Sequence, residues 1–303
     1  MQILTVKLAI DMYISDSKCR NLSPNTLDLM KYAFKSFGKS IDSEKNIIEI
    51  NNISVRQYLF SVIENRSPST AARYWEILRT FFKWCINEEF IETNPMGTIR
   101  KPRKNPIIIN PLSAQDVEKM INSIGNDFVG IRNKLIISLL FDCGFRATEL
   151  CSLNIEDIDL DNKTILIRHG KGNKPRLLPY GVFSSKLLMK YLVYRGDLAS
   201  DSLIINAYGD PVDRHSIRQI IERISNKVGL KVTPHQLRHS CAVAMLRNGS
   251  DAFTVQKLLG HSTLLMTRHY SQLADSDLIL KHSLYSPADR LNCISTEKKK
   301  RII

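Results

Sequence analysis

Side chains that can bind phosphate or transfer protons gather in four short segments of this 303-residue chain. The segments are residues 143–150 (CGFRATEL), 170–176 (GKGNKPR), 233–240 (TPHQLRHS) and 259–270 (LGHSTLLMTRHY). Each contains a glycine or a proline, residues that punctuate helices and turns. Arginine and lysine bind phosphate oxygens, and histidine and tyrosine exchange protons. These residue types predict chemistry on a phosphodiester.

Two of the segments hold pairs of side chains three residues apart. Arg146 lies just after Gly144, which breaks the preceding apolar helix, and Glu149 follows one turn later. The spacing puts Arg146 and Glu149 on one face, where they can form an ion pair. His235 and Arg238 have the same spacing in a helix that begins at a Thr-Pro pair. Both of their side chains can therefore reach one phosphate.

The other two segments supply three more candidates. Lys171 lies between two glycines in a predicted hairpin turn, where a flexible basic side chain can enter a groove or stay in solvent. His261 follows Gly260, which is expected to end a helix. Nine residues separate His261 from Tyr270. That is room for a turn and a short helix that returns the tyrosine to the same pocket.

In this order and context the candidates resemble the tyrosine recombinases of the phage-integrase family, most closely the compact Xer-type members. The family pattern has an Arg in G-x-R-x-x-E, a hairpin Lys in G-K-G-N-K, an H-x-x-R helix, a His or Trp after a helix-ending glycine, and a nucleophilic Tyr. The matching residues are Arg146, Lys171, His235, Arg238, His261 and Tyr270. The resemblance spans the whole of both predicted domains.

The residue types suit attack of a tyrosine on a phosphodiester, which builds negative charge on the phosphate oxygens. Arg146 and Arg238 stay charged at any working pH and offer planar pairs of donors for those oxygens. His261 can add a hydrogen bond, and His235 can act as a general base or assist the phosphate. Tyr270 is the expected nucleophile, and it needs nearby cations and a base because its free pKa is about 10.

The resemblance implies the remaining roles and the course of the reaction. Lys171 is expected to protonate the leaving 5′ oxygen, and Glu149 to orient the histidine or an arginine. The product is a covalent 3′-phosphotyrosyl DNA with a free 5′ hydroxyl, and a second strand's 5′ hydroxyl can reverse the step. No cofactor is expected, and no Cys or His cluster has zinc-ligand spacing.

The elements that must position these residues form two predicted domains. Residues 1–99 read as a small all-α domain, which the resemblance identifies as a DNA-binding core-binding domain. Residues 112–291 read as helices around a small antiparallel sheet, which the resemblance identifies as the catalytic domain. The predicted fold class is therefore mainly α with a small antiparallel β-sheet (α+β).

Within these domains, apolar periodicity predicts individual elements. The expected helices are Leu4–Asp16, Leu27–Phe37, Ser54–Glu64, Ala71–Ile86, Ile131–Cys143, Val182–Tyr194, Asp213–Val228, Pro234–Asn248 and Asp251–Leu259, with another at the start of 112–291 and one after Ser276. The expected strands are Ile155–Leu160, Thr164–Arg168 and Arg176–Pro179, the last two forming a hairpin.

The positive charge of the chain is concentrated in particular places. The total is +13, but residues 1–99 hold 12 basic and 11 acidic residues and are almost neutral. A basic linker at 100–111 and a basic tail at 292–303 carry much of the excess. The expected DNA contacts are Arg100, Lys101, Arg103, Lys104, Lys174 and Arg176. Nucleic acid is the favoured polyanion, although acidic lipid or solubility could also explain the charge.

The composition, 43% hydrophobic and 24% charged, is that of a soluble globular protein, and a cytoplasmic location without membrane contact is expected. The resemblance implies a homotetramer on two double-stranded DNA sites, with or without a second recombinase as partner. The apolar segment 276–291 would dock in the same copy or a neighbouring one. Two alternatives stay open: a type IB-like topoisomerase, and a DNA-binding relative with an inactive site. Integration, excision and dimer resolution are equally compatible with these residues.

Overall fold

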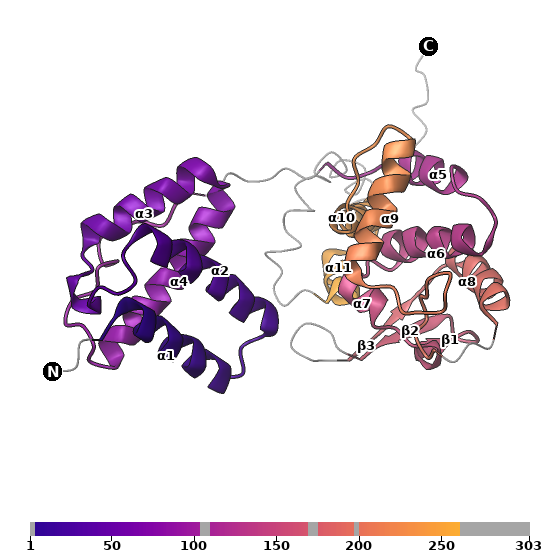
Figure 1. Cartoon of the computed structure of the whole chain (residues 1–303). Coiled ribbons are helices and arrows are strands. Elements are labelled where there is room, and N and C mark those ends of the chain that lie inside the picture. Colours follow the sequence, from indigo (N-terminus) through magenta and orange to yellow (C-terminus); the bar gives the residue numbers. More distant parts are fainter. Residues whose placement is uncertain (1–3, 104–109, 169–174, 197–199, 261–303) are drawn as a thin grey trace, which may run out of the picture. The chain divides into compact units, whose positions relative to one another are not determined.

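The computed structural model describes residues 4–103, 110–168, 175–196 and 200–260 and divides into two compact units, Met1–Ile108 and Ile109–Ile303 (Figure 1). Each unit has its own hydrophobic core. None of the helices in these ranges is long and apolar enough to cross a membrane.

The first unit contains four α-helices where the sequence predicts four. They are α1 (Val6–Cys19), α2 (Pro24–Ser40), α3 (Asn52–Asn65) and α4 (Pro68–Asn87). Ser23 and Ser67 cap α2 and α4, and each is followed by a proline in the first turn. The proline lacks the N–H that would be unpaired at that position, so the Ser-Pro pair fixes each helix start.

Aromatic rings fill the core of the first unit. The ring of Phe81 on α4 lies 5.5 Å from Tyr13 on α1 and 5.2 Å from Phe34 on α2, centroid to centroid. These edge-on contacts tie three helices together. The indole N–H of Trp75 donates to the carbonyl oxygen of Ile99 at 3.0 Å, so the chain after α4 also packs on this unit.

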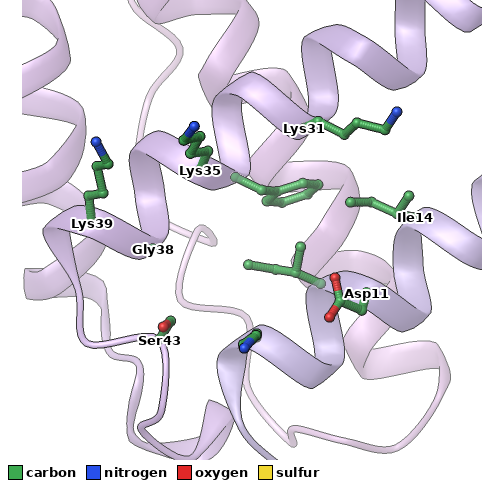
Figure 2. A pocket seen from close by; sticks show the side chains of 10 residues that line it. Asp11, Ile14, Lys31, Lys35, Gly38, Lys39 and Ser43 are labelled. Carbon is green, nitrogen blue, oxygen red and sulfur yellow. The ribbon is translucent and has the colours of Figure 1, made fainter.

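A basic groove of about 400 Å³ runs between α1 and α2 (Figure 2). Lys31, Lys35 and Lys39 recur at four-residue steps along α2, and Lys7 lines the groove from α1. Four residues advance a helix by about 6 Å. The lysines therefore form a row with one positive charge at each turn. Figure 2 also shows Asp11 on the facing helix.

The second unit is built around α6 (Phe128–Asp142), which runs through the middle of it in Figure 1. The side chains on every side of α6 are buried, including Leu135, Ile136 and Leu139. The other helices are α5 (Ala114–Asn122), α7 (Ala147–Cys151), α8 (Val182–Arg195), α9 (Arg214–Lys227), α10 (Pro234–Arg247) and α11 (Ala252–Leu259). The most extensive contacts of α6 are with α8 and α10.

A three-stranded antiparallel sheet completes the unit in the order β1-β2-β3. The strands are β1 (Ile158–Asp159), β2 (Thr164–Ile167) and β3 (Arg176–Pro179). β2 pairs with β3 from Thr164 opposite Pro179 to Ile167 opposite Arg176, which is the predicted hairpin. The described elements confirm the predicted fold class.

The prediction of a strand at Ile155–Leu160 is wrong for the first half of that range. Residues Ile155–Asp157 form one turn of 3₁₀-helix, and only Ile158–Asp159 pair with β2. The backbone N–H of Asn154 donates to the carboxylate of Asp157 at 2.8 Å. Such local bonds from an acidic side chain compete with strand pairing, and the apolar pattern does not reveal them.

Candidate active site

The turn after α6 positions the first two predicted site residues. Gly144 has φ = +62°, and a Cβ added there would lie 2.5 Å from a methyl carbon of Leu259, so any other residue would be strained at this position. The chain then turns into α7, for which Arg146 is the N-terminal cap. The backbone N–H of Arg146 donates to Glu149 at 2.9 Å and its guanidinium donates to the same carboxylate at 2.6 Å. The predicted Arg146–Glu149 pair is confirmed.

The carboxylate of Glu149 binds more than Arg146. Arg176, at the start of β3, donates to its Oε2 at 3.0 Å, and a guanidinium nitrogen of Arg238 on α10 lies 3.8 Å from the same oxygen. Glu149 is only 4% exposed. One buried acid thus gathers three arginines from three separate elements.

The surroundings of Glu149 keep its carboxyl group negatively charged. Burial alone would raise the pKa of this carboxyl, but the hydrogen bonds and positive charges of Arg176 and Arg146 outweigh burial and lower the pKa. Glu149 is therefore ionised at neutral pH. It balances part of the positive charge that would otherwise force the arginines apart.

Two of these arginines also hold the end of α11. Arg238 donates to the carbonyl oxygens of Gly144 and Leu259, and Nε of Arg176 lies 3.4 Å from the carbonyl oxygen of Leu258. The last carbonyls of a helix carry partial negative charge and lack helical partners. The arginines thus fix the end of α11 one residue before Gly260, which directly precedes His261 in the sequence.

Arg146, His235 and Arg238 line one cavity of about 650 Å³. Thr233 caps α10 and Pro234 occupies its first turn, which puts His235 and Arg238 on the same face one turn apart. Arg214, His215 and Arg218 line the cavity from α9. The described residues of its wall include four arginines and two histidines and no acidic side chain. Such a cavity suits a ligand with negative charge.

His235 is electrically neutral at pH 7. Its pKa is lowered from the ordinary 6.5, first because the ring is partly shielded from water and then because Arg238 and Arg146 repel a proton. A neutral imidazole can accept a proton from a neighbouring hydroxyl group.

The structure brings together Arg146, His235, Arg238 and Glu149 among the predicted site residues. Lys104, Lys171, Lys174, His261 and Tyr270 lie outside the described residues. Arg100, Lys101 and Arg103 are exposed in the first unit, and Lys101 pairs with Glu76. The side chain of Arg176 is 15% exposed and bonded to Glu149, so a direct DNA contact by Arg176 stays a prediction.

Arg214, His215 and Arg218, which line the cavity, are not among the site residues predicted from the sequence. Arg214 and Arg218 are four residues apart at the start of a predicted helix, so their shared face was visible in the sequence. What it does not reveal is that α9 lies beside α10. Among the described residues no group of three or more His, Cys, Asp or Glu could hold a metal ion.

Comparison with known proteins matches this chain to one family. The model of the "Phage integrase family" matches residues 110–277. The "Tyrosine recombinase XerC" of Listeria innocua is 31% identical over 282 residues, which cover 88% of this chain and 93% of that protein. The "Tyrosine recombinase XerD" of Listeria monocytogenes is 31% identical over 267 residues, covering 84% and 90%.

Solved structures agree with the family match. XerH site-specific recombinase, bound to a palindromic difH substrate in a post-cleavage complex, is 25% identical with a TM-score of 0.71 and covers 90% of this chain and 82% of that one. A lambda integrase(75-356) dimer bound to a COC' core site has a TM-score of 0.75 at 20% identity, covering 86% and 97%. At 20% sequence identity, this similarity supports a shared fold and nothing further.

Removing the charge of Glu149 should destabilise the second unit. We expect Glu149→Gln to lower the free energy of unfolding by about 3 kcal/mol at pH 7, because three arginines lose a buried counter-charge. The folded-state pKa is depressed, so this contribution is present above the ordinary value of 4.5 and is lost as the pH falls through the folded-state pKa. Urea unfolding at pH 7 and pH 4 measures both effects.

The matched control is Glu76→Gln, since Glu76 is 48% exposed in its pair with Lys101. This substitution should lower the free energy of unfolding by less than about 1 kcal/mol. If Glu149→Gln and Glu76→Gln lowered the free energy of unfolding equally, the proposed importance of the buried carboxylate would be contradicted.

The lowered pKa of His235 can be measured directly. In an NMR titration of the DNA-free protein, we expect the ring of His235 to titrate below 6.5, and its pKa to rise in Arg146→Gln because one repelling charge is gone. An unchanged pKa in Arg146→Gln, or a wild-type value above 6.5, would refute this electrostatic coupling.

Proposed function

Since this chain belongs to the phage integrase family and is a site-specific tyrosine recombinase that breaks and rejoins DNA, we propose that the cavity between α7, α9 and α10 holds the scissile phosphate. The observation that supports this proposal is the joint presence of Arg146, His235 and Arg238 in a cavity wall without acids. A DNA phosphate carries one negative charge and two free oxygens, which a guanidinium can bind in parallel.

The two proposed phosphate ligands, Arg146 and Arg238, differ in how freely their side chains can move. Arg146 keeps 31% of its side-chain surface exposed, whereas Arg238 is 3% exposed and fixed by the carbonyls of Gly144 and Leu259. Arg238 therefore offers a rigid positive charge. The Arg146 side chain can move to meet the phosphate, within the limits set by its bonds to Glu149. Preorganised charges of this kind stabilise a transition state without reorganisation.

The reaction follows from these positions and from the family pattern. The hydroxyl oxygen of Tyr270 attacks the phosphorus, and the bond from phosphorus to the 5′ oxygen breaks. The tyrosine proton passes to a base, for which neutral His235 is suited, and Lys171 supplies a proton to the leaving 5′ oxygen. The product is a 3′-phosphotyrosyl bond and a free 5′ hydroxyl. Attack by another 5′ hydroxyl reverses the same steps and rejoins the strands.

Further basic side chains, in the cavity wall and beyond it, would hold the duplex. Arg214 and Arg218 extend the positive wall along α9, and Arg100 and Arg103 lie exposed beyond the first unit's core. We assign residues 1–99 to a DNA-binding domain, 100–111 to a linker, 112–291 to the catalytic domain and 292–303 to a basic tail. The lysine row of α2 gives the first domain a surface that fits a phosphate backbone.

The expected partner is a double-stranded recombination site bound by four copies of this chain, or by copies of this chain together with a second recombinase. The structure of XerH, solved with its palindromic difH substrate, supports a DNA partner for this chain. Integration, excision and dimer resolution all use the same cleavage step.

The covalent step is tested with a nicked suicide DNA substrate, from which the cleaved strand's short 5′ end diffuses away. We expect the wild-type protein to form an SDS-resistant protein–DNA adduct and Tyr270→Phe to form none, because phenylalanine lacks the attacking oxygen. Tyr208→Phe is the matched control, since Tyr208 is 91% exposed and lines none of the cavities described above. An adduct that persists in Tyr270→Phe would disprove the assignment of the nucleophile.

A further inference from the structure

Arg132 on α6 is a buried positive charge with neutral partners. Only 6% of its surface is exposed. Its guanidinium donates to the side-chain oxygen of Asn133 at 2.9 and 3.2 Å and to the carbonyl oxygen of Ile205 at 3.1 Å. Across the described ranges, no carboxylate oxygen lies within 4.0 Å of this guanidinium.

Arg132 lines a cavity of about 460 Å³ that is separate from the candidate active site. A second arginine, Arg223 on α9, lines the same cavity, together with the hydroxyl of Ser216 and the amide of Gln219. The remaining lining residues are Asn206, Pro211, Val212 and Ile220. None of the described residues that line this cavity is acidic.

The two arginines of this cavity repel each other. Burial is the largest effect on the pKa of Arg132 and lowers it; Tyr191 opposes this, the charge of Arg223 lowers the pKa further, and Asp127 raises it by the smallest amount. A buried charge is costly unless an opposite charge or several hydrogen bonds compensate it. Arg132 has hydrogen bonds to neutral oxygens, but the compensating charge is missing among the residues that line the cavity.

Arg195 shows that burial of an arginine does not by itself indicate a ligand. It is 3% exposed, and its guanidinium donates to the carbonyl oxygens of Gly196, Ser200 and Ser202, which it ties into one loop. Arg195 lines none of the cavities described above. Arg132 differs because it faces an open cavity together with a second arginine and two polar side chains.

The two cavities lie on different flanks of α9. Arg214, His215 and Arg218 line the candidate active site, and Ser216, Gln219 and Arg223 line the second cavity. At 100° per residue the centres of these two sets lie about 130° apart around the helix. The sets face different sides of α9 and meet where the side chains of His215 and Gln219 contact each other at 3.0 Å.

We propose that this second cavity is a binding site for a phosphate-type oxyanion, either free phosphate or the phosphate group of a small molecule such as a nucleotide. Arg132 provides the buried charge and N–H donors, and Arg223, which lines the same cavity, adds a second positive charge. Ser216 and Gln219 can donate further hydrogen bonds to the remaining oxygens. The bound anion would neutralise the two arginines and stabilise the packing of α9 against α6.

The test is an NMR titration of the full chain with inorganic phosphate, against chloride at equal ionic strength. We expect the Nε–Hε signal of Arg132 and the backbone signals of Ser216 and Gln219 to shift and saturate with phosphate but not with chloride. A parallel titration with adenosine monophosphate distinguishes the two sources, because a nucleotide site should bind it more tightly than free phosphate.

Two single-charge variants on α9 separate this site from the active-site cavity. Arg223→Gln should weaken the phosphate response of Arg132 about tenfold, because it removes one charge-assisted contact. Arg218→Gln removes the same charge from the same helix but lines the other cavity, so it should leave that response unchanged.

Two outcomes would overturn the proposal. The first is a phosphate response confined to Arg146 and Arg238. The second is an Arg132 response that Arg223→Gln and Arg218→Gln weaken equally, which would indicate only a general charge effect. Since Arg223 is exposed, its substitution tests the site without removing the buried Arg132.

Discussion

The arrangement of the second unit depends on the buried carboxylate of Glu149. Three guanidinium groups of like charge would not remain close together without a shared counter-charge. Glu149 accepts hydrogen bonds from Arg146 and Arg176 and lies 3.8 Å from Arg238. These arginines come from a helix start, a strand and a second helix, so this one carboxylate joins three elements that are far apart in the sequence.

The same network connects the proposed phosphate ligands to the end of α11. Arg238 lies in the cavity wall and also binds the carbonyl of Leu259, while Arg176 lies within 3.4 Å of the carbonyl of Leu258. Gly144 and Gly260 adopt φ values of +62° and +61°, and each is packed closely against this network. In the sequence, His261 follows Gly260 and Tyr270 comes nine residues after His261. A change at Glu149 should therefore affect both the proposed phosphate ligands and the end of α11.

The sequence predicts those parts of the structure that local chemistry determines. The Thr-Pro start places the beginning of α10 correctly, and the three-residue spacings predict that Arg146 pairs with Glu149 and that His235 shares a face with Arg238. The sequence does not predict contacts that depend on packing between elements. In particular, an alternating strand pattern does not say that Arg176 faces inward to Glu149, and a helical period does not say which cavity Arg214 lines.

The claim that Glu149 holds the arginines in a catalytic arrangement is tested most directly by single-turnover cleavage. The measurement is the rate of covalent adduct formation on the suicide substrate by Glu149→Gln, at a temperature where circular dichroism shows it folded. The account predicts a rate at least about tenfold below wild type, because misplaced preorganised donors lose much of their effect. DNA affinity should stay within about twofold, since the backbone contacts that dominate it lie elsewhere. Cleavage by folded Glu149→Gln at the wild-type rate would contradict the account.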